Sequence, residues 1–161
     1  MEIRIATEKD LSIVREIAFV TWPVTYGTIL SQDQLDYMLH LIYSLDALTI
    51  QMKEKKHCFL FAQDASGILG FASYSIENSL GRLHKLYVLP SAQGKKVGTD
   101  LLSFIEREAS KAGCAHMQLN VNRYNDALHF YKQKGYSILF EEDIPIGKSY
   151  SMNDYRLEKR L

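Results

Sequence analysis

The residues best suited to bind a charged ligand lie in a turn between an apolar stretch and an amphipathic one. Residues 86–88 are strand-like, and residues 93–99, which follow closely, contain Gly94, Gly98 and two lysines. A turn from a strand into a helix leaves unpaired backbone N–H groups at the helix N-terminus, where the helix dipole also favours negative charge. We therefore expect this turn to hold a phosphate group. It is neither a P-loop, which ends in Gly-Lys-Ser/Thr, nor a dinucleotide loop, which needs three glycines at fixed spacing.

A second segment, residues 119–136, joins an alternating strand to a short helix. Asn125 can cap that helix, and Gly135 follows its end at a position that favours positive φ. Tyr131 lies on the helix, about one and a half turns beyond the cap. Considered alone, Tyr131 is a half-buried core residue and Asn125 simply a cap, so the segment gains meaning only together with the first one.

Together, the two segments resemble the GNAT acyltransferase superfamily. Residues 93–98 resemble its pyrophosphate loop, Gln/Arg-x-x-Gly-x-Gly/Ala, and residues 119–136 are similar to its second signature, L-x-V-x-x-x-N-x-x-A-x-x-F-Y-x-x-x-G-F/Y. Lys96 stands where the loop pattern has its middle glycine. A side chain there limits how closely the backbone approaches a pyrophosphate, while an added cation beside Lys95 offsets part of that loss.

The resemblance implies acetyl-CoA as the cosubstrate, with no metal ion. The strand backbone at residues 86–88 would pair with the pantetheine as an added strand does, and the loop would hold the pyrophosphate through its N–H groups. Asn125 would contact the donor from the opposite wall. The donor-binding residues expected on this basis are Leu86, Tyr87, Val88, Gln93, Gly94, Lys95, Lys96, Val97, Gly98, Thr99 and Asn125.

The family's chemistry is direct transfer, in which a primary amine attacks the thioester and coenzyme A leaves as a thiolate. Tyr131 is the candidate acid, because its phenol can donate a proton where the negative charge develops. A lysine-like amine of pKa ~10.4 is neutral in only about one molecule in 2,500 at pH 7, a shortfall of roughly 4.6 kcal/mol. His84 is the candidate base, and Glu77 acting through water is the alternative. His84 is equally well interpreted as a structural residue of its strand.

The acceptor is less well defined than the donor, because its binding residues come from variable segments such as 22–43 and 77–82. Three stretches, 21–27, 83–90 and 146–155, resemble the diamine and polyamine acetyltransferase branch of the superfamily. Other acceptors compatible with the motifs are protein N-termini, lysines and amino sugars. A small-molecule amine is therefore the expected substrate, and a polyamine is its most specific form.

A polycation favours carboxylates and aromatic faces, which Trp22, Tyr26 and Glu77 can supply. The alternative is that Trp22 and Tyr26 pack the helical part of the fold. Asp154 is expected to pair with a basic neighbour in the final strand. Two further functions remain open: a non-catalytic acetyl-CoA sensor, suggested by Lys96, and an α/β interaction domain whose motif matches are accidental.

Composition is that of an ordinary globular protein and excludes several classes. Lys plus Arg and Asp plus Glu are each 19, so the formal net charge is zero, and there is no basic run of the kind that binds nucleic acid. No apolar run approaches membrane-spanning length, and we expect a cytoplasmic protein with no membrane association. Cys58 and Cys114 lack metal-ligand spacing and are expected to be reduced.

The periodicity of the chain predicts an α/β (α+β) fold in one domain, residues 1–161. The resemblance implies a mixed, mostly antiparallel sheet of about seven strands flanked by four to five helices. A homodimer is possible through the apolar side chains Tyr150, Met152 and Tyr155. The expected strands lie near 2–6, 58–63, 68–76, 82–89, 119–121, 136–141 and 150–158, and the expected helices follow Thr7, Ser31, Ser44, Lys96 and Asn125.

Overall fold

The computed structural model describes residues 1–161. Seven strands and five α-helices make up the fold, together with two short 3-10 helices. In chain order they are β1 (Glu2–Ile5), η1 (Glu8–Asp10), α1 (Leu11–Tyr26), α2 (Gln32–Tyr43), α3 (Leu45–Lys53), β2 (Cys58–Asp64), β3 (Gly67–Glu77), β4 (Leu80–Val88), η2 (Pro90–Ala92), α4 (Val97–Lys111), β5 (His116–Asn122), α5 (Ala127–Gln133), β6 (Ser137–Gly147) and β7 (Tyr150–Arg160).

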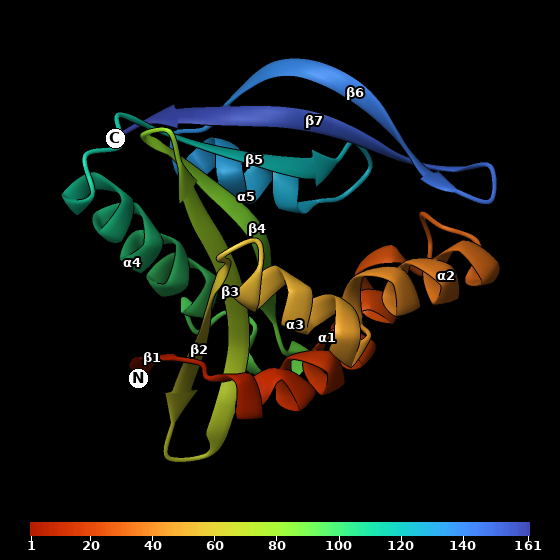
Figure 1. The fold of residues 1–161 in the computed structure, drawn as a ribbon, viewed down its shortest axis with the longest axis horizontal. Helices are drawn as coiled ribbons and strands as arrows, with labels where there is room; N and C mark the ends of the chain where they lie inside the picture. Colours follow the sequence, from red (N-terminus) through yellow and green to blue (C-terminus); the bar gives the residue numbers. More distant parts are fainter.

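The strands form one sheet in the order β1-β2-β3-β4-β5-β7-β6 (Figure 1). Every neighbouring pair is antiparallel except β4 and β5, which run parallel. The prediction of a mixed, mostly antiparallel sheet flanked by helices is therefore confirmed. The parallel pair is possible because α4 connects the two strands as a crossover helix.

The parallel pair parts soon after it begins. β4 and β5 are paired over four residues only, from Leu80 opposite His116 to Leu83 opposite Leu119. Beyond this point β4 stays bonded to β3 as far as Val88, while β5 stays bonded to β7 as far as Asn122. Each strand thus keeps its outer neighbour and loses its inner one, so backbone groups along the two inner edges are left without a strand partner.

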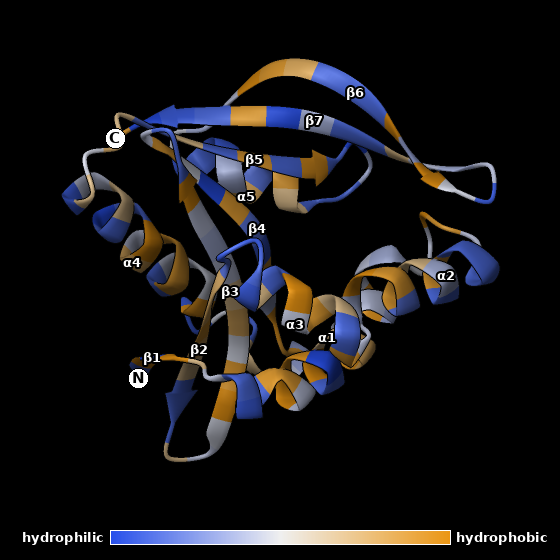
Figure 2. Ribbon diagram, in the orientation of Figure 1, coloured by the Kyte–Doolittle hydropathy of each residue, from blue (hydrophilic) through white to orange (hydrophobic).

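Helices cover both faces of the sheet and enclose two hydrophobic cores (Figure 1). The first core joins α4 and α5 to the sheet and includes Leu101, Ile105 and Met117, all fully buried. The second joins α1, α2 and α3 to the other face, around Tyr43 and Phe59. Figure 2 shows hydrophobic and hydrophilic residues alternating around α4, as expected for a helix with one face on a core. None of the helices combines the length and apolar character needed to cross a membrane.

Local signals in the sequence explain where several helices begin. The Ser31 side chain accepts a hydrogen bond from the Gln34 backbone N–H at 3.2 Å, and Ser44 caps α3 in the same way through Ala47 at 3.1 Å. These two caps confirm the predicted helix starts. β6 extends to Gly147, well past its predicted end. Pro145 does not end the strand, because β6 is at the edge of the sheet, where the missing N–H of a proline costs no hydrogen bond between strands.

Gly70 brings β3 unusually close to the part of β4 that has left β5. A Cβ at Gly70 would lie 2.7 Å from the Tyr87 carbonyl oxygen and 3.1 Å from the Val88 Cα, and neither backbone atom can move aside cheaply. We expect Gly70→Ala to lower the free energy of unfolding by about 1–3 kcal/mol, measured by urea denaturation.

Gly98, in the first turn of α4, is the matched control for the same substitution. Its Cβ would meet only side-chain atoms, at 3.6 Å or more. Gly98→Ala should therefore stabilise the protein, by roughly 0.5–1 kcal/mol, because alanine favours the helix. Equal effects of the two substitutions would contradict the proposed contact between β3 and β4.

Candidate active site

A cleft opens where β4 and β5 part, and it consists of two adjoining cavities. The outer one has a volume of about 790 Å³ and the inner one about 50 Å³. Both are lined by Leu86, Tyr87, Asn125, Ala127 and Tyr131, so these side chains stand at the junction of the two spaces. The unpaired edge of β4 thus forms one wall, and the turn that leads into α5 forms the other.

The predicted phosphate loop forms one end of the outer cavity. Lys96 precedes α4 with a left-handed backbone, φ 62° and ψ 19°, and it is the residue that replaces the glycine of the loop pattern. The N–H groups in the first turn of α4 have no partner within the helix and carry its positive dipole end. The Gln93 side chain donates to the Val88 carbonyl oxygen at 3.2 Å, which ties the loop to the end of β4.

Almost all of the residues expected to bind the donor line this outer cavity. They are Leu86, Tyr87, Val88, Gln93, Gly94, Lys96, Val97, Gly98, Thr99 and Asn125. Lys95 is the exception, because it lies outside both cavities. The N-cap of α5 is Asp126, one residue after the predicted Asn125, although the Asn125 Oδ1 does accept the N–H of Ala127, the first residue of the helix, at 2.9 Å.

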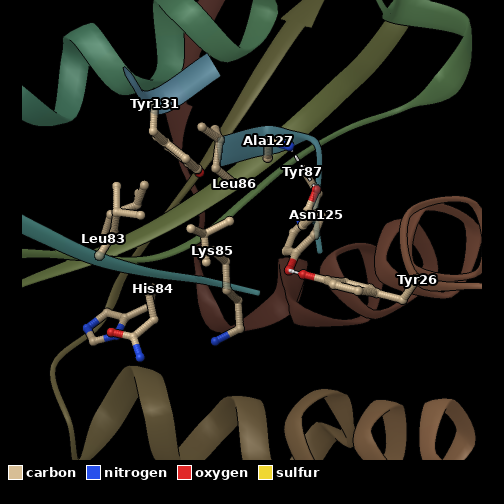
Figure 3. A pocket seen from close by; sticks show the side chains of 12 residues that line it. Tyr26, Leu83, His84, Lys85, Leu86, Tyr87, Asn125, Ala127 and Tyr131 are labelled. Atoms are coloured by element: carbon tan, nitrogen blue, oxygen red, sulfur yellow. Dashed lines mark hydrogen bonds between the residues drawn. The ribbon is translucent and has the colours of Figure 1, made fainter. Parts of the chain in front are cut away.

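Tyr131 lies on α5 with its side chain almost fully buried at the junction of the two cavities. Its ring packs against Phe130 and Tyr136, with centroids 5.2 and 5.8 Å away. Figure 3 shows the side chain directed towards Leu86, on the unpaired edge of β4. Burial raises the pKa of Tyr131, so its phenol keeps its proton at neutral pH. The side chain can therefore donate a proton or a hydrogen bond into the cleft.

Tyr26 and Tyr87 close the cleft on the side of α1. Their hydroxyl groups are hydrogen-bonded at 3.0 Å (Figure 3). Trp22, a predicted acceptor residue, lies behind them with its ring 4.6 Å from that of Tyr26 and its indole N–H donating to Tyr43. Trp22 lines neither cavity and is a core residue, which corrects the expectation that it faces the acceptor.

Of the three predicted acceptor residues, Tyr26 lines the inner cavity, whereas Glu77 ends β3 at an exposed position outside both cavities. The sheet carries its carboxylate to the β3–β4 turn, away from the parting of β4 and β5. Glu77 therefore does not belong to the cleft, either as an acceptor contact or as a base acting through a nearby water.

His84 lines the inner cavity, but its surroundings make it a poor base. Its ring stacks on His57 at 3.7 Å, and its Nε2 is hydrogen-bonded to the Ser75 hydroxyl at 2.7 Å. Burial, and then the charges of His57 and Lys85, lower the pKa of His84 to about 3. Proton transfer from an ammonium of pKa ~10.4 would then be uphill by roughly 10 kcal/mol. The structural interpretation of His84 therefore replaces the catalytic one.

Two polar residues of the inner cavity were not anticipated from the sequence. Lys85 is buried, and its Nζ donates to Gln51 Oε1 at 2.5 Å and lies over the Tyr43 ring. Burial lowers the pKa of Lys85 to about 7. Asn120 lines the same cavity from β5. Neither stands out in the sequence, because β4 also contains Arg82 and His84, and β5 also contains Gln118 and Asn122.

Nowhere in the fold do three or more His, Cys, Asp or Glu side chains gather closely enough to hold a metal ion. The cleft instead offers backbone N–H groups, lysines, neutral tyrosines and amides. Such a set binds a phosphorylated ligand at its outer end and supports proton donation at its inner end.

Comparison with known proteins agrees with this geometry. Residues 29–144 match the acetyltransferase (GNAT) domain family. The chain is 29% identical over 143 residues to a spermidine N(1)-acetyltransferase of Thermoplasma acidophilum, covering 86% of this chain and 89% of the relative.

Solved structures show the same fold. The chain superposes on the PaiA N-acetyltransferase of Thermoplasma acidophilum, solved in complex with coenzyme A, with a TM-score of 0.81, 28% identity and full coverage of both chains. A GCN5-related N-acetyltransferase of Rhodopseudomonas palustris gives a TM-score of 0.85 at 19% identity, with 99% of this chain and 95% of that one covered. Since the family match spans most of the sequence, the chain belongs to the GNAT family of acetyltransferases and is an acetyl-CoA-dependent N-acetyltransferase.

Proposed function

We propose that this enzyme acetylates a primary amine of a diamine or polyamine, and that residues 1–161 act as one catalytic domain. The observation that carries the proposal is the inner cavity, where Tyr131 meets the unpaired edge of β4. The class of acceptor is supported by the similarity to a spermidine N(1)-acetyltransferase over most of both chains. It is also supported by the tyrosine and asparagine side chains of the cavity, beside which Lys85 is the one basic group whose pKa lies near 7.

The outer cavity is the proposed donor site. The loop at 93–99 and the start of α4 would hold the pyrophosphate through backbone N–H groups, with the dipole of α4 favouring the negative charge. The edge of β4 at Leu86, Tyr87 and Val88 would pair with the pantetheine amides, since these backbone groups have lost β5 as a partner. The thioester would then reach the junction beside Tyr131.

The protonation states of the residues at the junction suggest how the acetyl group would be transferred there. The acceptor nitrogen attacks the thioester carbon, the carbon–sulfur bond breaks, and Tyr131 gives its phenolic proton to the departing sulfur. The proton released by the acceptor nitrogen restores the phenol or leaves through water. Because the lowered pKa makes His84 a weak base, the acceptor enters this step as the free amine, whose fraction rises with pH.

Replacing Tyr131 with Phe tests the acid. We expect Tyr131→Phe to lower kcat by about a hundredfold or more with little change in the dissociation constant of acetyl-CoA, because only proton donation is removed. Tyr136→Phe is the matched control, since the Tyr136 hydroxyl is buried without a hydrogen-bond partner next to Tyr131. Steady-state kinetics should show near-normal turnover for the control. Normal turnover in both variants would exclude Tyr131 from the mechanism.

Lys96 offers a test of the donor loop that separates stability from binding. A non-glycine residue in the left-handed region costs about 1–2 kcal/mol, so Lys96→Gly should stabilise the fold by up to about 1 kcal/mol after the entropy cost of glycine. The same variant loses a cation at the cleft, and its KM for acetyl-CoA should rise and depend less on salt. Lys95→Gly, at a position without positive φ, should not be stabilised. A destabilised Lys96→Gly would refute the strain argument.

The acceptor class is tested by following thiol release from acetyl-CoA with a panel of amines. Diamines, spermidine and spermine should be turned over, with rates that increase between pH 7 and pH 9. Amino sugars and peptides with free N-termini or lysines should react poorly. Preference for a peptide or an amino sugar would replace the proposed acceptor, and binding of acetyl-CoA without turnover of any amine would favour the sensor function.

A further inference from the structure

Asp154 is a buried carboxylate whose charge has no direct partner. It lies on β7 opposite Asn122 of β5 and is only 6% exposed. Its Oδ2 accepts one hydrogen bond, from the Asn120 side-chain amide at 3.0 Å. Burial is the main cause of a raised pKa at Asp154, which means that the ionised form costs free energy in the folded protein.

Two of the three neighbouring cations are paired with other carboxylates. Arg156 is paired with Glu142 at 3.0 Å, and Arg123 is paired with Asp143 at 2.8 Å. Arg82 has no carboxylate within ion-pair distance: its Nη2 donates to the Asn120 side-chain Oδ1 at 2.8 Å, and its Nη1 is buried without a hydrogen-bond partner. No basic side chain lies within ion-pair distance of the Asp154 carboxylate, so the predicted pairing of Asp154 with a basic neighbour is wrong.

Glu142 provides a direct comparison on the adjacent strand. It accepts the same Asn120 amide group, at 2.7 Å, and it also receives the Arg156 guanidinium. Hydrogen bonds from Asn120 and Arg156 lower the pKa of Glu142, whereas burial raises that of Asp154. Two carboxylates thus share one amide, and only Asp154 lacks a cation.

Asp154 faces the acceptor side of the cleft. Met152, two residues earlier on β7, packs against the core of α1 and α2, and side chains two residues apart in a strand share a face. On that side lies Tyr26, whose pKa is raised by burial and also by the charge of Asp154. Asn120 and Tyr26 both line the inner cavity, so the carboxylate lies one side chain behind its wall.

We propose that the charge of the Asp154 carboxylate attracts a second ammonium group of the acceptor, the one that is not acetylated, to the wall of the inner cavity in front of it. Tyr131 and the edge of β4 mark the position of the reacting nitrogen. Asp154 lies farther away, on β7, the strand on the other side of β5 from β4. A second ammonium a few carbon atoms away in the acceptor would bring a positive charge towards this carboxylate, which has no basic side chain within ion-pair distance. This inference rests on the proposed function and identifies a residue that would select diamines over monoamines.

The experiment compares 1,4-diaminobutane with n-butylamine, which has the same length but lacks the second ammonium. At saturating acetyl-CoA we expect Asp154→Asn to raise the KM for the diamine at least tenfold, equivalent to about 1.4 kcal/mol. Its kcat and its KM for n-butylamine should stay within about threefold of the wild-type values. Glu142→Gln removes the same charge next to the same amide and should leave the KM for the diamine within about threefold.

The variant should fold, because asparagine can still accept the Asn120 hydrogen bond and the cost of a buried charge disappears. We expect an equal or higher melting temperature for Asp154→Asn at pH 7. An unchanged KM for the diamine would overturn the inference, as would an equal rise for both amines. If the wild-type enzyme turns over neither amine, titration calorimetry with 1,4-diaminobutane on the coenzyme A complex decides the matter: affinity lost in Asp154→Asn but kept in Glu142→Gln supports the inference, and equal affinities refute it.

Discussion

The parting of β4 from β5 is the constraint on which the rest of the structure depends. Parallel pairing holds the two strands together only from Leu80 to Leu83, and each then follows its antiparallel neighbour outwards. Backbone groups that a continuous sheet would pair are left facing a cleft. The loop at 93–99, the start of α5 and Tyr131 all adjoin this opening. A ligand that pairs with these backbone groups would therefore offset the free-energy cost of leaving the two strands apart.

Burial then sets the proton chemistry of the cleft. The same desolvation that keeps Tyr131 protonated lowers the pKa of His84 to about 3 and that of Lys85 to about 7. The inner cavity therefore presents neutral groups at physiological pH, apart from Lys85, whose pKa lies close to that pH. Asp154, set behind the wall, is a buried anion without an ion-pair partner. A site of this kind retains a proton donor without providing a strong base.

Much of the fold, and most of the residues that line the outer cavity, could be predicted from the sequence, because both depend on local patterns. Ser31 and Ser44 cap helices through their own side chains, and residues 93–99 carry the strand–turn–helix pattern in consecutive positions. The residues on the acceptor side were predicted less well. Trp22 and Glu77 have suitable side chains, but whether such a side chain meets the cleft depends on the packing of α1 and on where β3 ends.

The sequence by itself determined the order of the elements, the caps at Ser31 and Ser44, the family to which the chain belongs and the loop that leads into α4, since each of these is encoded by neighbours along the chain. Only the tertiary structure decided which polar groups are buried together. The pKa of His84 is lowered by burial and then by the charges of His57 and Lys85, and Asp154 shares an amide with Glu142 on another strand. Desolvation and charge–charge interactions depend on distance in space, and a pattern along one strand does not contain that information.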